Sequence, residues 1–556
     1  MQGGNSGFRT EAAGLPAGNG IPAPLPDLFP GMVHTGLMRM TIPGLLPAAL
    51  ALATAPVALA QFSPDPASPT LLASGTGEQV QPKVVAIPAG GFYMSWYDGA
   101  SGYDPWVQRY DANGNGLWPN GGVKVLETSF SSTEDYGLTI DAAGNAVVVT
   151  RRDSPSLGII AQAVSPEGQL LWGTGGRLVS TTGSVNSPKA GRTGDGAAVA
   201  GWTEGSRAKV MRLNANGTSA WATASTVTDG TATTILSDLQ PGNGDSVIAS
   251  VVRYTTFSGA KTLQAQKFSG AGAAMWAATN VRVFATGSLQ FGNFPTFLPD
   301  GEGGAVFGWY QTSPLQCRVQ WVAPDGTLRF GTNGQVTSTD TSREAVSPAI
   351  AFDPVARKVY ASWPTRVPNS SIYGVAAQAF DEFGVGLWGP TGTTLVFDET
   401  VYSQQFAGAA VVGGFPMFTW IRSTSFGQDT VYAMSVDPSN GSARWPQPTA
   451  ATAASTIGRN VLTAMPGATN PWALYVFERG GTGAADLFGA RINADGTLGT
   501  PDTNCADLNG DGRVSGSDLG LLLGQWGGPA APPFDLNGDA LVNGADLGIL
   551  LGCWNP

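Results

Sequence analysis

One turn motif recurs along this chain and constrains its fold more than any other feature. In most copies it reads Asp/Asn/Ser-x-x-Gly, with an aromatic residue four positions after the glycine. Successive glycines are 54, 49, 55, 54, 58, 57 and 55 residues apart, so the chain is built from units of one regular length. The motif glycines and their aromatics are Gly114 with Trp118, Gly168 with Trp172, Gly217 with Trp221, Gly272 with Trp276, Gly326 with Phe330, Gly384 with Trp388, Gly441 with Trp445, and an eighth glycine, Gly496, without an aromatic.

Each unit reads as four short β-strands. In the first unit, apolar and polar residues alternate over residues 83–87, 91–96, 105–110 and 123–126, and Gly and Asn turns separate these segments. Helical periodicity of useful length is absent from residues 62–500. Four strands in a unit of about 55 residues are typical of a β-propeller blade. The sequence therefore predicts an all-β, eight-bladed propeller over residues 61–500, with seven blades as the alternative.

The two ends of this region predict how the ring closes. The eighth unit stops near Pro501 and lacks an outermost strand, whereas residues 70–74 form a strand-like segment before the first unit. A ring joined in this way leaves no long unpaired strand. We therefore expect residues 70–74 to complete the last blade. The repeated aromatic residues are expected to pack between blades.

The last fifty residues contain a different, duplicated motif with a spacing of 28 residues. Each copy places oxygen-bearing side chains at loop positions 1, 3, 5, 9 and 12 and a backbone carbonyl at position 7, the arrangement that wraps an EF-hand-type loop around one calcium ion. The predicted ligands of two calcium ions are Asp507, Asn509, Asp511, Arg513 (carbonyl), Ser515 and Asp518, and Asp535, Asn537, Asp539, Leu541 (carbonyl), Asn543 and Asp546. Without metal, three carboxylates in each loop repel one another, so folding should depend on calcium.

Each loop is followed by one helix-like segment, 518–526 or 546–554, with no comparable segment before it. A duplicated loop-plus-helix unit resembles the type I dockerin module of bacterial secreted proteins, and the resemblance covers residues 505–554. It implies a small α-helical calcium-binding module over residues 501–556 that docks to a cohesin-like protein or a cell-surface anchor.

The partner-binding positions depart from the dockerin pattern. Studied dockerins use a Ser-Thr-like pair at loop positions 10 and 11 and basic residues further along the helix. Here the pairs are Gly516-Ser517 and Gly544-Ala545, and the first helix continues without Lys or Arg. The resemblance therefore carries over calcium binding but not the choice of partner.

The N-terminal sixty residues read as a leader. Met38-Arg-Met40, the apolar run 42–59 and Ala58-Leu-Ala60 match the three parts of a secretory signal, so we expect residues 1–60 to be an upstream segment with a cleaved signal peptide and the mature protein to be secreted, extracellular or at the cell surface. The only histidine, His34, lies before the cleavage site. Histidine-dependent catalysis and imidazole metal sites are then excluded from the mature chain.

The remaining composition restricts cysteine chemistry and partners. Cys505 and Cys553 stand at the two ends of the calcium module, where a disulfide would clamp it in an oxidising compartment. Cys317 lies in an alternating strand pattern and is expected to be a buried small hydrophobe. With 29 Lys and Arg against 40 Asp and Glu, the chain is a poor match for nucleic acid.

Two functions fit these features. The first is a secreted scaffold whose propeller binds a carbohydrate or protein ligand while the calcium module docks. The second is a carbohydrate-active enzyme, a glycoside hydrolase or polysaccharide lyase involved in polysaccharide catabolism. A glycosidase needs two carboxylates facing each other across a pocket. Binding is favoured because none of the five candidate carboxylates falls in a motif that sets its partner; all five are expected in loops: Glu134, Asp135, Glu204, Glu302 and Glu344.

Overall fold

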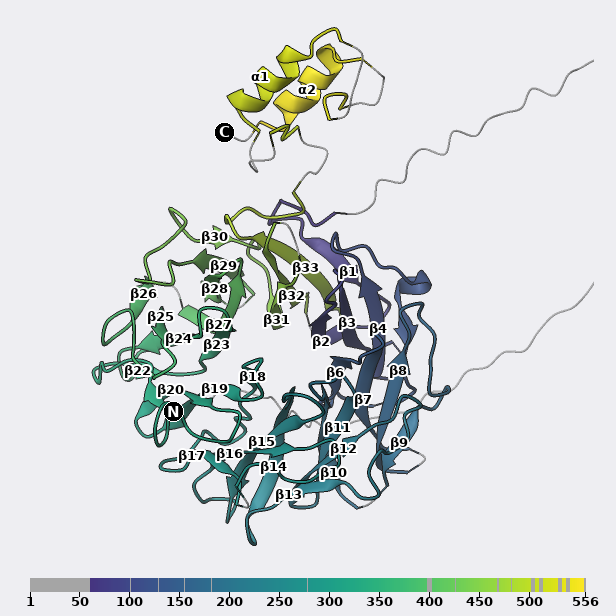
Figure 1. Cartoon of the computed structure of the whole chain (residues 1–556), viewed down its shortest axis with the longest axis vertical. Coiled ribbons are helices and arrows are strands. Elements are labelled where there is room, and N and C mark those ends of the chain that lie inside the picture. The colour runs from purple at the N-terminus through teal and green to yellow at the C-terminus, as the bar shows by residue number, and fades with distance from the viewer. Residues whose placement is uncertain are drawn as a thin grey trace, which may run out of the picture. The chain divides into compact units, whose positions relative to one another are not determined.

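The structure, a computed structural model, consists mainly of eight β-sheets arranged in a ring (Figure 1). It describes residues 61–556 except 101, 129, 155, 182, 278, 398–402, 426, 468–469, 482, 502–505, 510–513, 529–532, 537–540 and 555–556. Residues 1–60, the predicted leader with His34, lie outside the described residues, as do Cys505 and four of the predicted calcium ligands: Asp511, Arg513, Asn537 and Asp539.

The strands of blades 1 to 4 follow the chain in order. Blade 1 contains β2 (Gln79–Ala86), β3 (Phe92–Asp98), β4 (Asp104–Tyr110) and β5 (Val123–Lys124), with a 3₁₀ turn η1 (Pro119–Gly121) before β5; blade 2 contains β6 (Gly137–Ile140), β7 (Ala146–Arg152), β8 (Gly158–Val164) and β9 (Arg177–Ser180); blade 3 contains β10 (Val185–Arg192), β11 (Ala198–Glu204), β12 (Arg207–Arg212) and β13 (Ser225–Val227); blade 4 contains β14 (Thr233–Pro241), β15 (Val247–Tyr254), β16 (Thr262–Phe268) and β17 (Val281–Phe284).

Blades 5 to 8 continue the series. Blade 5 contains β18 (Phe297–Pro299), β19 (Ala305–Thr312), β20 (Leu315–Val322) and β21 (Gln335–Val336); blade 6 contains β22 (Glu344–Ala345), β23 (Ala349–Asp353), β24 (Lys358–Arg366), β25 (Gly374–Phe380) and β26 (Thr393–Val396); blade 7 contains β27 (Ser403–Val412), β28 (Phe415–Ser423), β29 (Asp429–Ser435) and β30 (Thr449–Ala450); blade 8 contains β31 (Ile457–Met465), β32 (Trp472–Arg479), β33 (Asp486–Asn493) and β1 (Thr70–Ala73).

The ring closes as the sequence predicts. Strand β1 pairs antiparallel with β33 in the sheet β1-β33-β32-β31, so the start of the propeller supplies the outermost strand of its last blade (Figure 1). Eight sheets are present in the described residues, which excludes the seven-blade alternative. Blade 6 differs from the expected four strands because its innermost strand is broken into β22 and β23.

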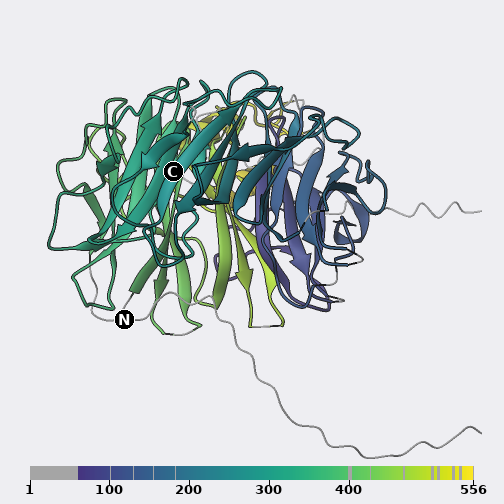
Figure 2. The same ribbon diagram turned by 90° about the horizontal axis from the view of Figure 1, so that it is seen from below.

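Antiparallel pairing within every blade gives the ring two distinct faces, seen edge-on in Figure 2. The innermost strands begin at one face, which also carries the connections between blades and the hairpins between second and third strands; we call it the connection face. The opposite face carries the repeated Gly-aromatic turns, and we call it the turn face.

Each aromatic of the repeated turn packs against the turn glycine of the next blade. A Cβ atom at Gly168 would lie 3.1 Å from the Trp118 ring, and one at Gly384 would lie 2.9 Å from the Phe330 ring. These glycines also have positive φ, a backbone conformation that other residues rarely adopt. The Trp118 indole N–H donates to the carbonyl of Pro166 at 2.9 Å. The predicted packing role of the repeated aromatics is confirmed.

The aromatic missing from the eighth unit is replaced by a residue from the other end of the ring. Phe62 is 1% exposed, and its ring lies 3.0 Å from the position of a Cβ at Gly114. The Phe62 N–H donates to Thr500 Oγ1 at 3.0 Å, and the Thr500 N–H donates to the Phe62 carbonyl at 2.9 Å. Phe62 therefore completes the circle of aromatic contacts next to the strand exchange of β1.

A buried glutamine stabilises most of these turns. In blade 1, the Gln108 side chain accepts a hydrogen bond from the backbone N–H of Trp118 at 3.0 Å and donates one to the backbone carbonyl of Trp118 at 3.0 Å. Glutamines at the same place in four further blades accept the backbone N–H of the turn aromatic: Gln162, Gln266, Gln320 and Gln378. Their spacing of six residues before the motif glycine is a regular sequence signal that the turn motif alone does not include.

The C-terminal region forms two helices, α1 (Gly516–Gly524) and α2 (Gly544–Gly552), each beginning and ending two residues before the segment that the sequence predicts. Their apolar core is small, with Ala506, Val514, Leu522, Val542 and Leu550 buried. Such a core stabilises a fold of this size only weakly.

Candidate functional site

A cavity of about 410 Å³ lies among the innermost strands of blades 5 to 8. Its polar lining comes from Asn293, Thr296, Ser347 and Asn460, and its aromatic lining comes from Phe294, Trp309 and Tyr310. None of the described residues lining it is Asp, Glu, Lys, Arg or His. An uncharged concavity lined by amides, hydroxyls and aromatic rings is typical of a small-molecule or glycan subsite, and its described lining contains no carboxylate for acid–base catalysis.

Five of the eight innermost strands share a local distortion next to their second strand. Their pairing with the second strand shifts register just before Lys83, Lys189, Asp238, Gly408 and Asn460. Such bulges redirect the following side chain. Pro82 and Pro188 stand at two of these shifts, and Pro348 stands in the break between β22 and β23; proline fits such irregular backbone because it cannot donate to the ladder.

The side of the channel formed by blades 1 to 4 is charged. Lys83 Nζ lies 3.3 Å from Asp135 Oδ1, and Lys189 binds the other oxygen of the same carboxylate. Burial opposes the ionisation of Asp135, but the two ammonium groups hold its pKa below the ordinary value. Burial lowers the pKa of Lys83 and raises the pKa of Asp238. Blades 1 to 4 thus carry charged groups on or beside their innermost strands, whereas the described lining of the cavity in blades 5 to 8 carries none.

The structure places the five candidate carboxylates in structural contacts. Asp135 binds the two lysines; Glu134 pairs with Arg151, Glu302 with Arg357, and Glu344 with Arg366; and Glu204 accepts from Ser180 and Trp202. The expectation that all five lie in loops is wrong for Glu204, which ends β11, and for Glu344, which begins β22. None of them lines the central cavity.

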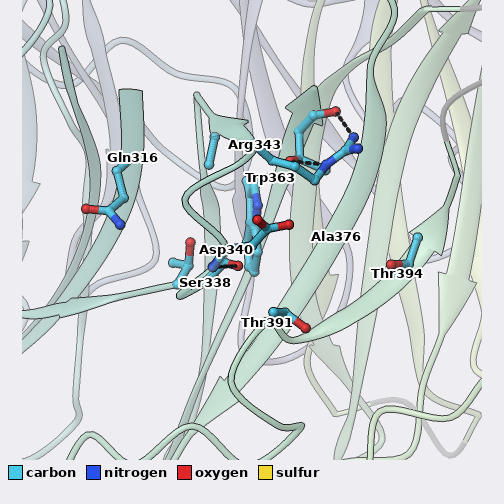
Figure 3. A pocket seen from close by; sticks show the side chains of 11 residues that line it. Gln316, Ser338, Asp340, Arg343, Trp363, Ala376, Thr391 and Thr394 are labelled. Atoms are coloured by element: carbon cyan, nitrogen blue, oxygen red, sulfur yellow. Dashed lines mark hydrogen bonds between the residues drawn. The ribbon is translucent and has the colours of Figure 1, made fainter. Parts of the chain in front are cut away.

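A second, smaller pocket of about 140 Å³ lies between blades 5 and 6 (Figure 3). Trp363 stands among polar side chains there, including Gln316, Thr391 and Thr394. Arg343 donates to the hydroxyl and the carbonyl of Thr365, both at 3.2 Å. Hydrogen bonds from the Ser342 hydroxyl and N–H hold the pKa of Asp340 below its ordinary value. This pocket offers one ionised carboxylate and hydroxyl groups but no described second carboxylate.

The two C-terminal loops end in equivalent, fully buried aspartates. Asp518 Oδ1 accepts the N–H groups of Leu508 at 2.9 Å and Asn509 at 3.2 Å, while its Oδ2 accepts that of Ser515 at 2.8 Å. Asp546 accepts the N–H of Leu536 at 2.7 Å and that of Asn543 at 2.8 Å. Burial opposes ionisation of Asp518, but these backbone N–H groups hold its pKa below the ordinary value. Each aspartate therefore links the first turn of its loop to the start of the following helix.

The same contacts have a structural role that needs no metal. Ser515 and Asn543 are the N-caps of α1 and α2, and each forms a capping box with the aspartate three residues later. Within the described residues, no group of three or more His, Cys, Asp or Glu side chains is positioned to hold a metal ion. The third carboxylates, Asp511 and Asp539, lie outside that part of the chain. The described oxygen donors fit a hard cation in chemical type, and calcium binding stays a prediction.

Two of the three cysteines, Cys317 and Cys553, lie in the described part of the chain. Cys317 is a free, fully buried cysteine, and burial raises the pKa of its thiol well above the ordinary value, which confirms a packing role. Cys553 packs partly buried against the apolar core of the helical pair. Its pairing with Cys505 stays a prediction.

The sequence did not identify the lining of the central cavity. Asn293, Ser347 and Asn460 are single polar residues in ordinary strand or loop patterns, and only the ring brings them together. Their neighbours in the sequence carry no signal that marks them as cavity residues. No helix in the described residues is long and apolar enough to span a membrane.

No protein-family model matches this chain, and no curated protein matches it in sequence. Solved structures similar to it include a polysaccharide lyase described as PL25-ulvanlyase, at 12% identity over 69% of this chain and 98% of that chain, with a TM-score of 0.41. The subtype N11 neuraminidase-like protein of A/flat-faced bat/Peru/033/2010 is 12% identical over 78% of this chain and 99% of that chain, with a TM-score of 0.35. The β-propeller domain of the Trilobed protease from Pyrococcus furiosus is 8% identical over 65% and 95%, with a TM-score of 0.36. These values are too low to transfer a substrate or a reaction.

Proposed function

We propose that this protein is a secreted binding and docking protein. Its propeller binds a ligand in the central cavity, and its C-terminal dockerin-like module binds two calcium ions and docks to a cohesin-like protein or a cell-surface anchor. The observation that carries the binding role is the lining of the cavity, whose described residues include amides, hydroxyls and aromatic rings but no carboxylate. Ligand binding without cleavage is the chemistry that this lining supports best.

The calcium proposal is supported by the equivalence of the two loops. Asp518 and Asp546 are fully buried and accept matching backbone N–H groups, and the two loops share most of their residues. Asp507 and Asp535 stand at position 1 of each loop, next to the N–H groups that the buried aspartates accept. Carboxylate oxygens at positions 1 and 12 are what a calcium loop requires.

Calorimetric titration of the mature chain, residues 61–556, tests this part. We expect two calcium ions per chain, one ion in the single variants Asp507→Ala and Asp535→Ala, and none in the double variant. Asp325→Ala, which removes a carboxylate from an exposed propeller turn, is the matched control and should retain two. A stoichiometry of zero in the unmodified chain would refute calcium binding.

The alternative, a carbohydrate-active enzyme, has less support in the site. A glycoside hydrolase needs a pair of carboxylates about 5 to 10 Å apart across the substrate. The described lining of the central cavity contains none, and the five candidates are engaged elsewhere. Release of reducing sugar from a polysaccharide by the purified chain would establish the enzyme instead.

A further inference from the structure

Two phenylalanines form an exposed pair on the connection face of blade 4. Phe257 lies in the hairpin between β15 and β16, and Phe291 lies in the connection from β17 to β18. Their ring centroids are 4.9 Å apart at an interplanar angle of 63°, and the residues are 70% and 62% exposed. Large exposed apolar groups that gather in one place usually mark a binding surface.

The aromatic pair is held in place by one lysine. Lys261 Nζ donates to the carbonyls of Phe257 at 2.8 Å and Gly259 at 2.9 Å, and it lies 5.5 Å from the centroid of the Phe291 ring. The ammonium group thus fixes the hairpin and makes a cation–π contact with the ring of the neighbouring connection. These contacts restrict the Phe257 hairpin and the Phe291 ring, which lowers the ordering cost that a ligand must meet on binding.

The pair is continuous with the central cavity. Phe291 precedes Asn293 by two residues, so their Cα atoms are at most about 8 Å apart. Asn293 and Phe294 line the cavity, and Phe294 is itself 42% exposed. An aromatic surface on blade 4 therefore leads into the uncharged cavity, and we call Phe257 and Phe291 the aromatic platform.

The chemistry of this combined surface indicates the class of ligand. The described cavity lining offers no cation for an anionic group and no carboxylate for a cationic one. Asn293 and Asn460 each provide donors and acceptors that suit hydroxyl groups, and Phe257 and Phe291 provide flat apolar faces. A molecule with hydroxyl edges and C–H-lined faces, but without charge, complements both. We propose that the ligand of the propeller is an uncharged saccharide chain that extends from the cavity onto the aromatic platform, an inference that rests on the proposed binding function.

Binding measurements on the mature chain test this proposal. A glycan array carrying uncharged and anionic saccharides would identify a bound glycan, and calorimetry would give its Kd. We expect an uncharged glycan to bind, and the double variant Phe257→Ala/Phe291→Ala to weaken it at least about tenfold. Asn460→Ala, in the cavity, should weaken the same glycan. Phe383→Ala is the matched control because Phe383 is 72% exposed in a hairpin on the turn face, and it should leave Kd unchanged.

The outcomes separate this inference from the function on which it rests. Binding only of anionic glycans, or of an uncharged glycan with the same Kd in the double variant, would overturn the saccharide proposal. A protein ligand whose binding is weakened by Asn460→Ala would also overturn the saccharide proposal, but it would support ligand binding in the cavity. Failure of every ligand to respond to Asn460→Ala would overturn both. Unchanged thermal unfolding of the surface double variant would show that its loss of binding is not a loss of fold.

Discussion

Phe62 contributes to closure of the propeller ring, and the variant Phe62→Ala measures how much stability its side chain provides. The side chain is 1% exposed and packs against Gly114, Leu72 and Gly489, and its ring centroid lies 5.6 Å from that of Trp472. Truncation removes the contact between the first repeated turn and the last blade. Replacing a buried phenylalanine with alanine costs about 3–5 kcal/mol, because the transfer free energy is lost and a cavity remains.

The expected shift in melting temperature is small because the cooperative unit is large. With an unfolding entropy of about 2.1 cal/mol/K per residue, a ring of roughly 440 residues has an entropy of about 0.9 kcal/mol/K, so a loss of 4 kcal/mol lowers Tm by about 4 °C. Differential scanning calorimetry resolves such a shift. Urea unfolding followed by tryptophan fluorescence gives an independent change in the transition midpoint.

Two further variants make the result interpretable. Phe330→Ala removes a turn aromatic that packs in the same way on Gly384 inside the ring, and it should cost about as much as Phe62→Ala. Phe383→Ala, at an exposed turn, should shift the free energy of unfolding by less than about 0.5 kcal/mol. If Phe330→Ala destabilises the chain while Phe62→Ala does not, the closure reasoning is wrong.

Three other predictions concern the exchanged strand β1, the ion pairs of Asp135 and the pairing of the cysteines. Deletion of residues 62–76 removes Phe62 and β1, exposes the edge of β33, and should lower the stability of the whole ring; a single calorimetric transition with unchanged Tm would contradict this. Asp135→Asn should lower the free energy of unfolding by about 1 kcal/mol near pH 6; the expected change is small because the carboxylate is partly exposed to solvent. Since the pKa of folded Asp135 lies below its ordinary 3.8, its contribution is present above that pH and is lost as pH falls further, so Tm of the unmodified chain should fall more steeply below about pH 4 than that of the variant; parallel profiles would count against it. Non-reducing peptide mapping of exported protein should recover Cys505 joined to Cys553 and Cys317 free; two free thiols at the ends of the module would remove the clamp.

The sequence predicted eight blades, with seven as the alternative, and it predicted the strand exchange and the packing role of the aromatics. Regular spacing made this possible, because a turn that recurs about every 55 residues carries its structural role locally. Gly114 and Gly326 have positive φ, and their aromatic residues, Trp118 and Phe330, follow at the same distance in the sequence. Even the truncated last unit was visible as a missing strand. The replacement of its missing aromatic by Phe62 was not visible, because Phe62 precedes the repeats and matches no motif.

Only the tertiary structure decided which residues meet in the channel. Asn293, Ser347 and Asn460 are separated by more than fifty residues from one another, and nothing in their neighbours distinguishes them from other polar residues. Lys83, Asp135 and Lys189 form one ion cluster only because the strands of three successive blades converge on the axis. Closing the ring turns residues that share a position in each repeat into neighbours around one channel. The repeat pattern therefore specifies the ring, whereas the residues that differ between blades on the innermost strands and connections specify what the cavity offers a ligand.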